Sequence, residues 1–136
     1  LGRRRLRSHD PADLGRPDIK LLFNANAEFA APLDARPTEK RAESVVFSSL
    51  ADAICVSGSI TGQAVDQSEL ARVKKAVGVP VLANTGVRID NVETILGVAD
   101  GCVIGTHFKV DGNTWNAVDR TRVARFMDKV RSLRGR

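Results

Sequence analysis

Two glycines, Gly86 and Gly105, each follow a short apolar run and each stand beside a threonine, Thr85 or Thr106. A glycine at the end of a strand lets the backbone come close to a ligand and adopt a positive φ. Steric needs of the chain alone can also place a glycine there. Two such strand ends in succession, each leading toward a helix, favour a binding site for phosphate or another anion.

A second group of polar residues lies in "FNANAEF", where Asn24, Asn26 and Glu28 are spaced two apart. In a strand this spacing puts all three on one face. Buried amides and carboxylates cost free energy unless something hydrogen-bonds them, so we expect the face to point into a site. Glu28 would be the general acid or base, and the asparagines would orient hydroxyl groups. A structural hydrogen bond to a neighbouring strand would also account for Glu28.

Further candidates follow the other apolar runs. Lys109 would neutralise developing charge, and the residues expected to contact substrate are Ser57, Thr61, Asn84 and His107. For Lys109 and His107 the alternative is ordinary solvation in a loop. We predict neither a metal nor a cofactor, because no metal motif such as H-E-x-x-H is present and the two cysteines lack partners at ligand spacing.

The elements that must position these residues alternate along the chain. Apolar runs without alternation are typical of buried parallel strands, and we expect them near 19–26, 53–57, 80–84 and 101–105. Helical patterns follow over 38–50, 66–77, 88–97 and 119–133. Thr38 and Asp66 are predicted N-caps, and Asp90 with Glu93 is a predicted capping-box variant. The order predicts an α/β fold with a parallel sheet, either doubly wound or a (β/α)4 half of a TIM barrel.

The chain of 136 residues suits one compact domain. We expect residues 1–17 to form a basic irregular arm and residues 18–136 to form the (β/α)4 unit. The net charge of +5 comes from the two basic ends, and the chain has only five Phe and one Trp. We therefore expect no nucleic-acid binding.

Without a bilayer-spanning run or a signal-peptide pattern, a cytoplasmic location and no transmembrane segment are expected.

Three segments in combination resemble the BtpA/SgcQ family: "ADAICVSGSITGQAVDQSEL", "VPVLANTGVRIDNV" and "ADGCVIGTHFKVDGNTWNAVD". "NANAEFAAPL" is similar to the SgcQ-like branch, and the resemblance runs from about Ile19 to about Val130. It implies a phosphate-binding type of TIM barrel, of which this chain matches the C-terminal half. Two positions depart from the family pattern. Glu28-Phe29 stands where many members have Lys-His, and Ala117 follows Asn116 where a proline is frequent.

Two classes of function stay open. The first is an enzyme, or a relic of one, that binds or converts a phosphorylated sugar or similar small metabolite, because SgcQ-like members resemble parts of sugar-metabolism gene sets. Isomerase, lyase and hydrolase chemistry are not distinguished. The second is a non-catalytic assembly or stability factor, as the family's link to photosystem I biogenesis implies. Trp115 would then anchor a contact surface; otherwise it would pack as a lid over the barrel mouth.

Half a barrel has a consequence for assembly. Two sheet edges stay open, and the inward faces lack the strands that fill a barrel. The candidates for those inward faces are Ile54, Val56, Leu82 and Ile104. We therefore predict a homo-oligomer and not a clean monomer.

Overall fold

The computed structural model describes residues 15–28, 30–58 and 63–135. Thr61, a predicted substrate contact, lies outside the described residues, as does most of the predicted basic arm.

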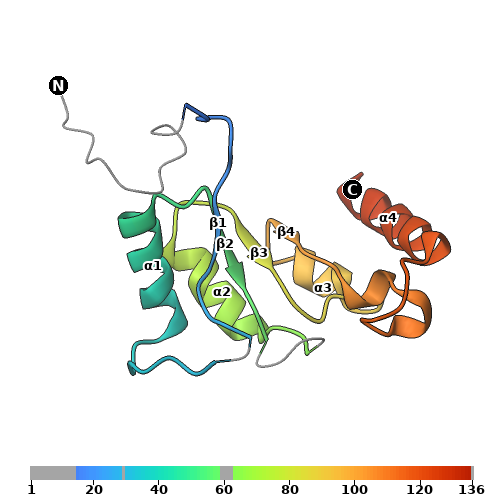
Figure 1. Cartoon of the computed structure of the whole chain (residues 1–136), viewed down its shortest axis with the longest axis horizontal. Coiled ribbons are helices and arrows are strands. Elements are labelled where there is room, and N and C mark those ends of the chain that lie inside the picture. The colour runs from blue at the N-terminus through green and yellow to red at the C-terminus, as the bar shows by residue number, and fades with distance from the viewer. Residues whose placement is uncertain (1–14, 29, 59–62, 136) are drawn as a thin grey trace.

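Strands and helices alternate along the described chain (Figure 1). Their order is β1 (Leu22–Asn24), α1 (Thr38–Ser49), β2 (Ala53–Val56), α2 (Gln67–Ala76), β3 (Val81–Ala83), α3 (Val92–Leu96), β4 (Gly101–Cys102) and α4 (Arg120–Arg134). Two 3-10 helices, η2 (Thr106–Phe108) and η3 (Val110–Gly112), lie between β4 and α4. Each predicted strand and helix is present, but the strands are shorter than predicted.

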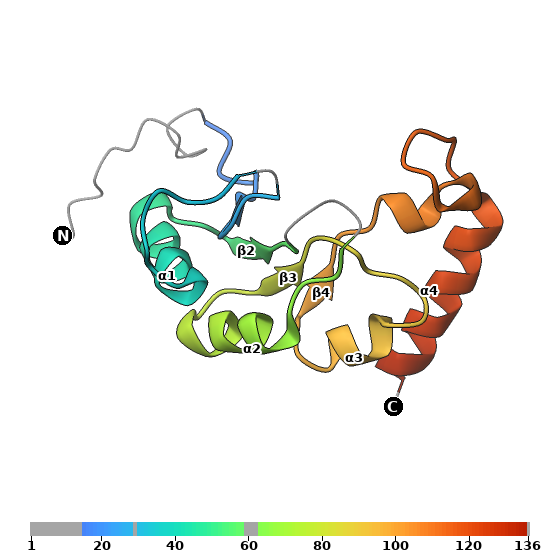
Figure 2. The same ribbon diagram turned by 90° about the horizontal axis from the view of Figure 1, so that it is seen from below.

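All strand pairs are parallel, and the sheet order is β1-β2-β3-β4. Figure 2 shows α1, α2 and α3 on the same side of the sheet, with α4 beyond β4 at the edge. A doubly wound sheet would carry helices on both faces, which this sheet does not in the part described. The fold is the predicted α/β fold, a parallel (β/α)4 unit that corresponds to half of a TIM barrel.

The core lies between the sheet and its helices. Ile54 and Val56 of β2 are fully buried there, so the expectation that they point to the uncovered inner face was wrong. Ile104 also packs against this core. They pack with residues of the helices, among them Leu70, Val73, Val92, Ile95, Phe126 and Val130. All four residues of β2 are buried, so its sequence has no alternation of apolar and polar residues. Without that alternation, the sequence does not show which residues face the helices, and an error of one residue exchanges the two faces of the strand.

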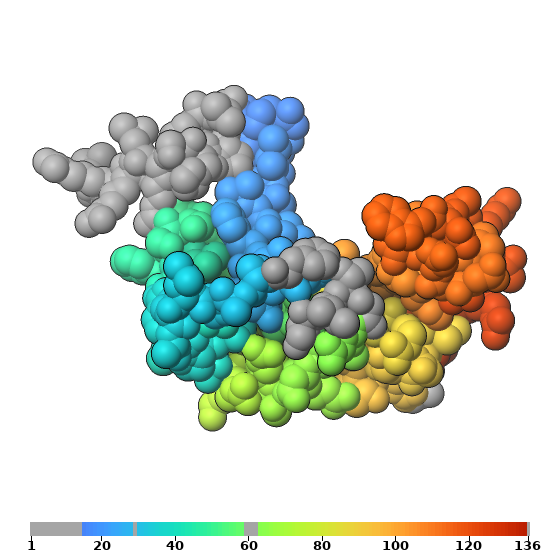
Figure 3. Space-filling view, turned by 60° about the horizontal axis from the view of Figure 1, so that its bottom comes forward, coloured from blue at the N-terminus to red at the C-terminus, as the bar shows by residue number. Residues whose placement is uncertain are grey.

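The opposite face of the sheet carries no helix in the described chain (Figure 2). Alternation and register place Leu22, Leu82 and Val103 on this open face. Leu22 is 51% exposed and Val103 is 43% exposed. Figure 3 shows the molecule hollowed between the segment that carries β1, in blue, and the segment before α4, in orange.

The helix starts agree with the sequence at one position and differ at two. Asp66 caps α2, since its carboxylate accepts a hydrogen bond from the Glu69 amide at 2.8 Å. Thr38 is not a cap: it is the first residue of α1, and its hydroxyl donates to the Glu69 carboxylate. The Asp90–Glu93 capping box is also absent, because α3 begins only at Val92 and has no side-chain cap.

Asp100 joins three elements at the amino-terminal end of the sheet. Its carboxylate accepts hydrogen bonds from Lys74 Nζ of α2 at 2.6 and 2.7 Å and from the Val81 amide of β3 at 2.7 Å. The Lys74 hydrogen bond, followed by that of the Val81 amide, lowers the pKa of Asp100 below its usual range. The ionised carboxylate therefore stabilises the fold.

We expect Asp100→Asn to lower the free energy of unfolding by about 1 kcal/mol at neutral pH, because the partly exposed ion pair is screened by water. A carboxyl group whose pKa is lowered in the folded state stabilises above its unfolded pKa of about 3.9 and loses that effect as pH falls toward the folded pKa. Urea titrations should therefore show the two proteins differing at neutral pH and converging below about pH 4. An undiminished difference in acid would contradict this account.

Candidate functional site

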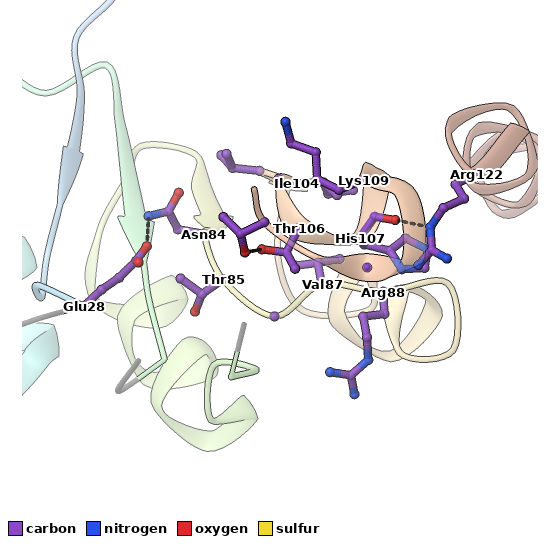
Figure 4. A pocket seen from close by; sticks show the side chains of 15 residues that line it. Glu28, Asn84, Thr85, Val87, Arg88, Ile104, Thr106, His107, Lys109 and Arg122 are labelled. Atoms are coloured by element: carbon purple, nitrogen blue, oxygen red, sulfur yellow. Dashed lines mark hydrogen bonds between the residues drawn. The ribbon is translucent and has the colours of Figure 1, made fainter. Parts of the chain in front are cut away.

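A cavity of about 350 Å³ opens at the carboxyl ends of β3 and β4 (Figure 4). The predicted site residues that line it are Glu28, Asn84, Thr85, Gly86, Gly105, Thr106, His107 and Lys109. Asn24, Asn26 and Ser57 do not line it. The structure thus brings the two glycine loops together with the acid of "FNANAEF" at one end of the sheet, where ligands of parallel α/β folds bind.

The two glycines have different surroundings. Gly86 has a φ of +62°, and a Cβ there would lie 2.2 Å from the Ala64 amide nitrogen. Its lack of a side chain lets the backbone of residues 63–64 pack against the loop after β3. A Cβ on Gly105 would meet nothing within 4 Å. Of these two glycines, only Gly105 therefore has open space around it.

The side-chain amide of Asn84 connects the ends of three strands. Its Nδ2 donates to Ser57 Oγ at 3.0 Å, to Asn24 Oδ1 at 3.2 Å and, at the longer distance of 3.5 Å, to Glu28 Oε1. An amide nitrogen has two protons, so three acceptors compete for them. The Glu28 carboxylate has the longest of these hydrogen bonds and faces the cavity (Figure 4).

Asn26 and Thr85 bond the backbone of the neighbouring loop. The Asn26 side chain donates to the Ser57 carbonyl at 2.7 Å and accepts from the Ser57 amide at 2.9 Å. Thr85 is buried, and its hydroxyl accepts a hydrogen bond from the Gly58 amide. Both side chains hold the loop after β2 in place, so Asn26 does not share the orientation of Glu28 as its spacing predicts.

Two cations, Lys109 and Arg122, both line the cavity on the side away from Glu28, and in Figure 4 their charged groups point in different directions. Lys109 and Arg122 are both half-buried, and neither forms a salt bridge with any acid in the described chain. Arg122 Nε donates to the His107 carbonyl at 2.7 Å, which leaves its two Nη groups for other acceptors. Arg88 also lines the cavity, but it is exposed and bonds Asp90 at 3.3 Å.

Arg122 and Arg88 were not among the predicted site residues, although the sequence contains a signal for each. Arg122 stands four residues before Phe126 and eight before Val130, on the stripe of α4 that is buried in the core. A charged residue on a buried stripe needs a partner or a ligand. Arg88 follows Gly86 in the same loop.

Helix N-termini contribute less to the site than predicted. α3 has five residues and η2 has three, and the dipole of a helix grows only with aligned peptide units. The turn before α3 is closed by Asn91, whose side chain accepts from the Arg88 amide at 2.8 Å and donates to the Gly86 carbonyl at 2.9 Å. Side-chain cations, not helix ends, supply the positive charge of this cavity.

His107 lies among aromatic rings and cations. Its ring centroid is 5.7 Å from that of Phe126 and 6.3 Å from that of Phe108. Burial, and then the charge of Arg122, lower the pKa of His107 below its ordinary value; Asp90 acts in the opposite direction and Arg88 adds to the lowering. The imidazole is therefore neutral at neutral pH.

The segment after η2 holds Trp115 away from the protein. Lys109 and Val118 form an antiparallel bridge, and Asn113 Oδ1 accepts from the Trp115 amide at 3.0 Å inside the turn. Trp115 is 93% exposed. The expected lid over the barrel mouth is therefore wrong for this structure, because the tryptophan has almost no protein surface against it.

The family model of the BtpA family matches residues 5–132. The chain belongs to the BtpA family. This BtpA-family chain is 47% identical over 122 residues to the sgc region protein SgcQ of Escherichia coli strain K12, covering 89% of the chain and 46% of SgcQ. The predicted resemblance to the SgcQ-like branch is thus confirmed.

More distant relatives show the same partial coverage. An uncharacterised protein of Pyrococcus abyssi is 41% identical over 85 residues, covering 62% of the chain and 33% of that protein. The solved structure of nitroalkane oxidase from Streptomyces ansochromogenes is 25% identical with a TM-score of 0.49, covering 71% of this chain and 29% of the oxidase. The chain spans a third to a half of the length of these curated relatives.

Cys55 is buried and Cys102 is half-buried, both are free thiols, and burial raises the pKa of each. Among the described residues, no group of three or more His, Cys, Asp or Glu side chains is arranged to hold a metal ion. No helix in the same part of the chain has the length and apolar character needed to cross a membrane.

Proposed function

We propose that this chain binds the phosphate group of a small metabolite in the cavity at the ends of β3 and β4. The observation that carries the proposal is the pair of half-buried cations, Lys109 and Arg122, without an acidic partner in the described structure. Partly buried charges cost free energy unless they are paired. A phosphate offers several charged acceptors to ammonium and guanidinium groups, and Gly105 and Thr106 border the same space.

The other end of the cavity suits hydroxyl groups. Glu28 offers carboxylate oxygens, and Asn84 offers its side-chain oxygen, whereas the two Asn84 Nδ2 protons already serve three acceptors. Hydroxyl groups can donate to both kinds of oxygen. A sugar phosphate would therefore fit with its phosphate near Lys109 and its hydroxyls near Glu28. In an enzymatic version of the function, Glu28 would be the general acid or base.

Thermal unfolding of the purified protein tests the proposal. Inorganic phosphate and a series of sugar phosphates should raise the melting temperature in proportion to the logarithm of their concentration, since they bind only the folded state. The same sugars without phosphate, at equal concentration and ionic strength, should have little effect. An equal response to both series, or none to either, would contradict a phosphate site.

A second candidate is the assembly factor, and the exposure of Trp115 favours it. Val118, 61% exposed, lies on the same hairpin, and exposed apolar groups of this kind mark contact surfaces. A protein partner that copurifies with the wild type and is lost with Trp115→Ser, in a protein that shows no response to phosphate compounds, would support this function over the first.

We expect the isolated chain to self-associate. β1 and β4 each have one free edge in the described sheet, and free edges are templates for pairing. Leu22 and Val103 on the open face stay about half exposed to water, and fully burying such side chains is worth roughly 1.5–3 kcal/mol each. A second copy, or the remaining half of a longer protein, would cover both.

Light scattering during size-exclusion chromatography measures this directly. The monomer has a mass of 14.7 kDa, and we expect a larger species at micromolar concentration. Leu22→Lys should shift the distribution toward the monomer, whereas Leu33→Lys, at a fully exposed leucine in the loop between β1 and α1, should not. A stable wild-type monomer would show that the open sheet is sufficient alone.

A further inference from the structure

His107 occupies an unusual position within the cavity. It is one of the lining residues, it packs beside Phe126 of α4, and its own carbonyl is bonded by Arg122 at 2.7 Å. The charged groups around it come from several elements. Arg122 comes from α4, and Arg88 and Asp90 precede α3. Lys109, two residues further along the chain, lines the same cavity.

Without a bound anion, the groups around His107 favour its neutral form. Two cations, Arg122 and Arg88, and one acid, Asp90, act on the imidazole, and Phe126 of α4 packs beside it, so a proton on the ring is disfavoured. An anion held by Lys109 and Arg122 would favour the protonated imidazole instead, because it brings negative charge into the space that His107 also lines. A positive imidazolium next to a bound dianion gains both attraction and a hydrogen bond.

We propose that anion binding in this cavity is linked to the uptake of a proton by His107. The inference depends on the anion site proposed above and deepens it, by naming the residue that makes the affinity depend on pH. Linkage is reciprocal: if the anion favours the protonated ring, lower pH must favour the anion. The site would then hold a dianion with three positive groups instead of two.

Sulfate is the probe of choice, because it carries the same charge between about pH 5 and pH 8, so that any proton taken up in this range belongs to the protein. We expect its dissociation constant to fall by roughly tenfold from about pH 8 to about pH 5.5. Calorimetric titrations in two buffers with different heats of ionisation should show net proton uptake at intermediate pH. His107→Asn should bind sulfate with an affinity that no longer depends on pH and without proton uptake.

A second measurement covers the case in which His107→Asn fails to fold. The chain has only two histidines, His9 and His107, so NMR of the imidazole protons gives two titration curves that His9→Asn assigns. Saturating sulfate should move the curve of His107 to higher pH and leave that of His9 in place. Equal movement of both curves would indicate a general salt effect and overturn the inference.

The two proposals fail in different ways. If sulfate binds in the cavity with an affinity that does not change with pH, or if His107→Asn still takes up a proton, the proton linkage is wrong and the anion site stands. If neither sulfate nor phosphate binds at any pH, the anion site is wrong and the linkage falls with it.

Discussion

Gly86→Ala should lower the free energy of unfolding by about 2–5 kcal/mol, the sum of a left-handed backbone cost and of overpacking. The φ of Gly86 is +62°, and the added Cβ would lie 2.2 Å from the Ala64 amide nitrogen and 2.3 Å from the Gln63 carbonyl carbon. Both obstacles are backbone atoms, which cannot rotate away as a side chain would. The loop after β3 and the segment at 63–64 must therefore separate.

Gly105→Ala is the matched control. The same methyl group at Gly105 would meet nothing within 4 Å, so the free energy of unfolding should change by no more than about 0.5 kcal/mol. Urea titrations followed by circular dichroism give both values. If the two variants were equally stable, the close packing of residues 63–64 against Gly86 would be refuted.

The second large effect concerns ligand binding. Lys109→Met and Arg122→Gln should each weaken the binding of a phosphate compound by roughly 10- to 100-fold, since a hydrogen bond to a charged group is worth about 1.5–3 kcal/mol. Each substitution removes one of the two half-buried cations and leaves a flexible, uncharged side chain in its place. Because Arg122 also bonds the His107 carbonyl, we expect its loss to reduce stability as well.

Arg120→Gln serves as the control for charge. Arg120 begins the same helix, α4, but is exposed and does not line the cavity. Arg120→Gln removes the same unit of positive charge, so it should weaken binding by less than about twofold if only cations that line the cavity contribute to binding. Isothermal titration of the three variants with one phosphate compound decides the matter. Equal losses in all three would indicate nonspecific attraction by a basic surface.

The sequence alone determined the alternation of strands and helices and the end of the sheet at which a site would form. Buried parallel strands appear as short apolar runs, and the residues that follow each run must meet at one edge. By this rule the sequence alone places Gly105, Thr106 and Lys109 at the same end of the sheet as Glu28. The cap at Asp66 was also readable, because a cap depends on neighbours three residues away.

The tertiary structure alone decided which residues complete the site and which residues brace it. Arg122 reaches the cavity only because Phe126 and Val130 turn that stripe of α4 inward. Gly86 serves the packing of residues 63–64, more than twenty positions earlier in the chain. The orientation of Ile54 could not be read from β2, because a strand buried on both faces has no alternation to reveal its register. Contacts between distant segments depend on how helices seat against the sheet, and local sequence patterns do not encode that placement.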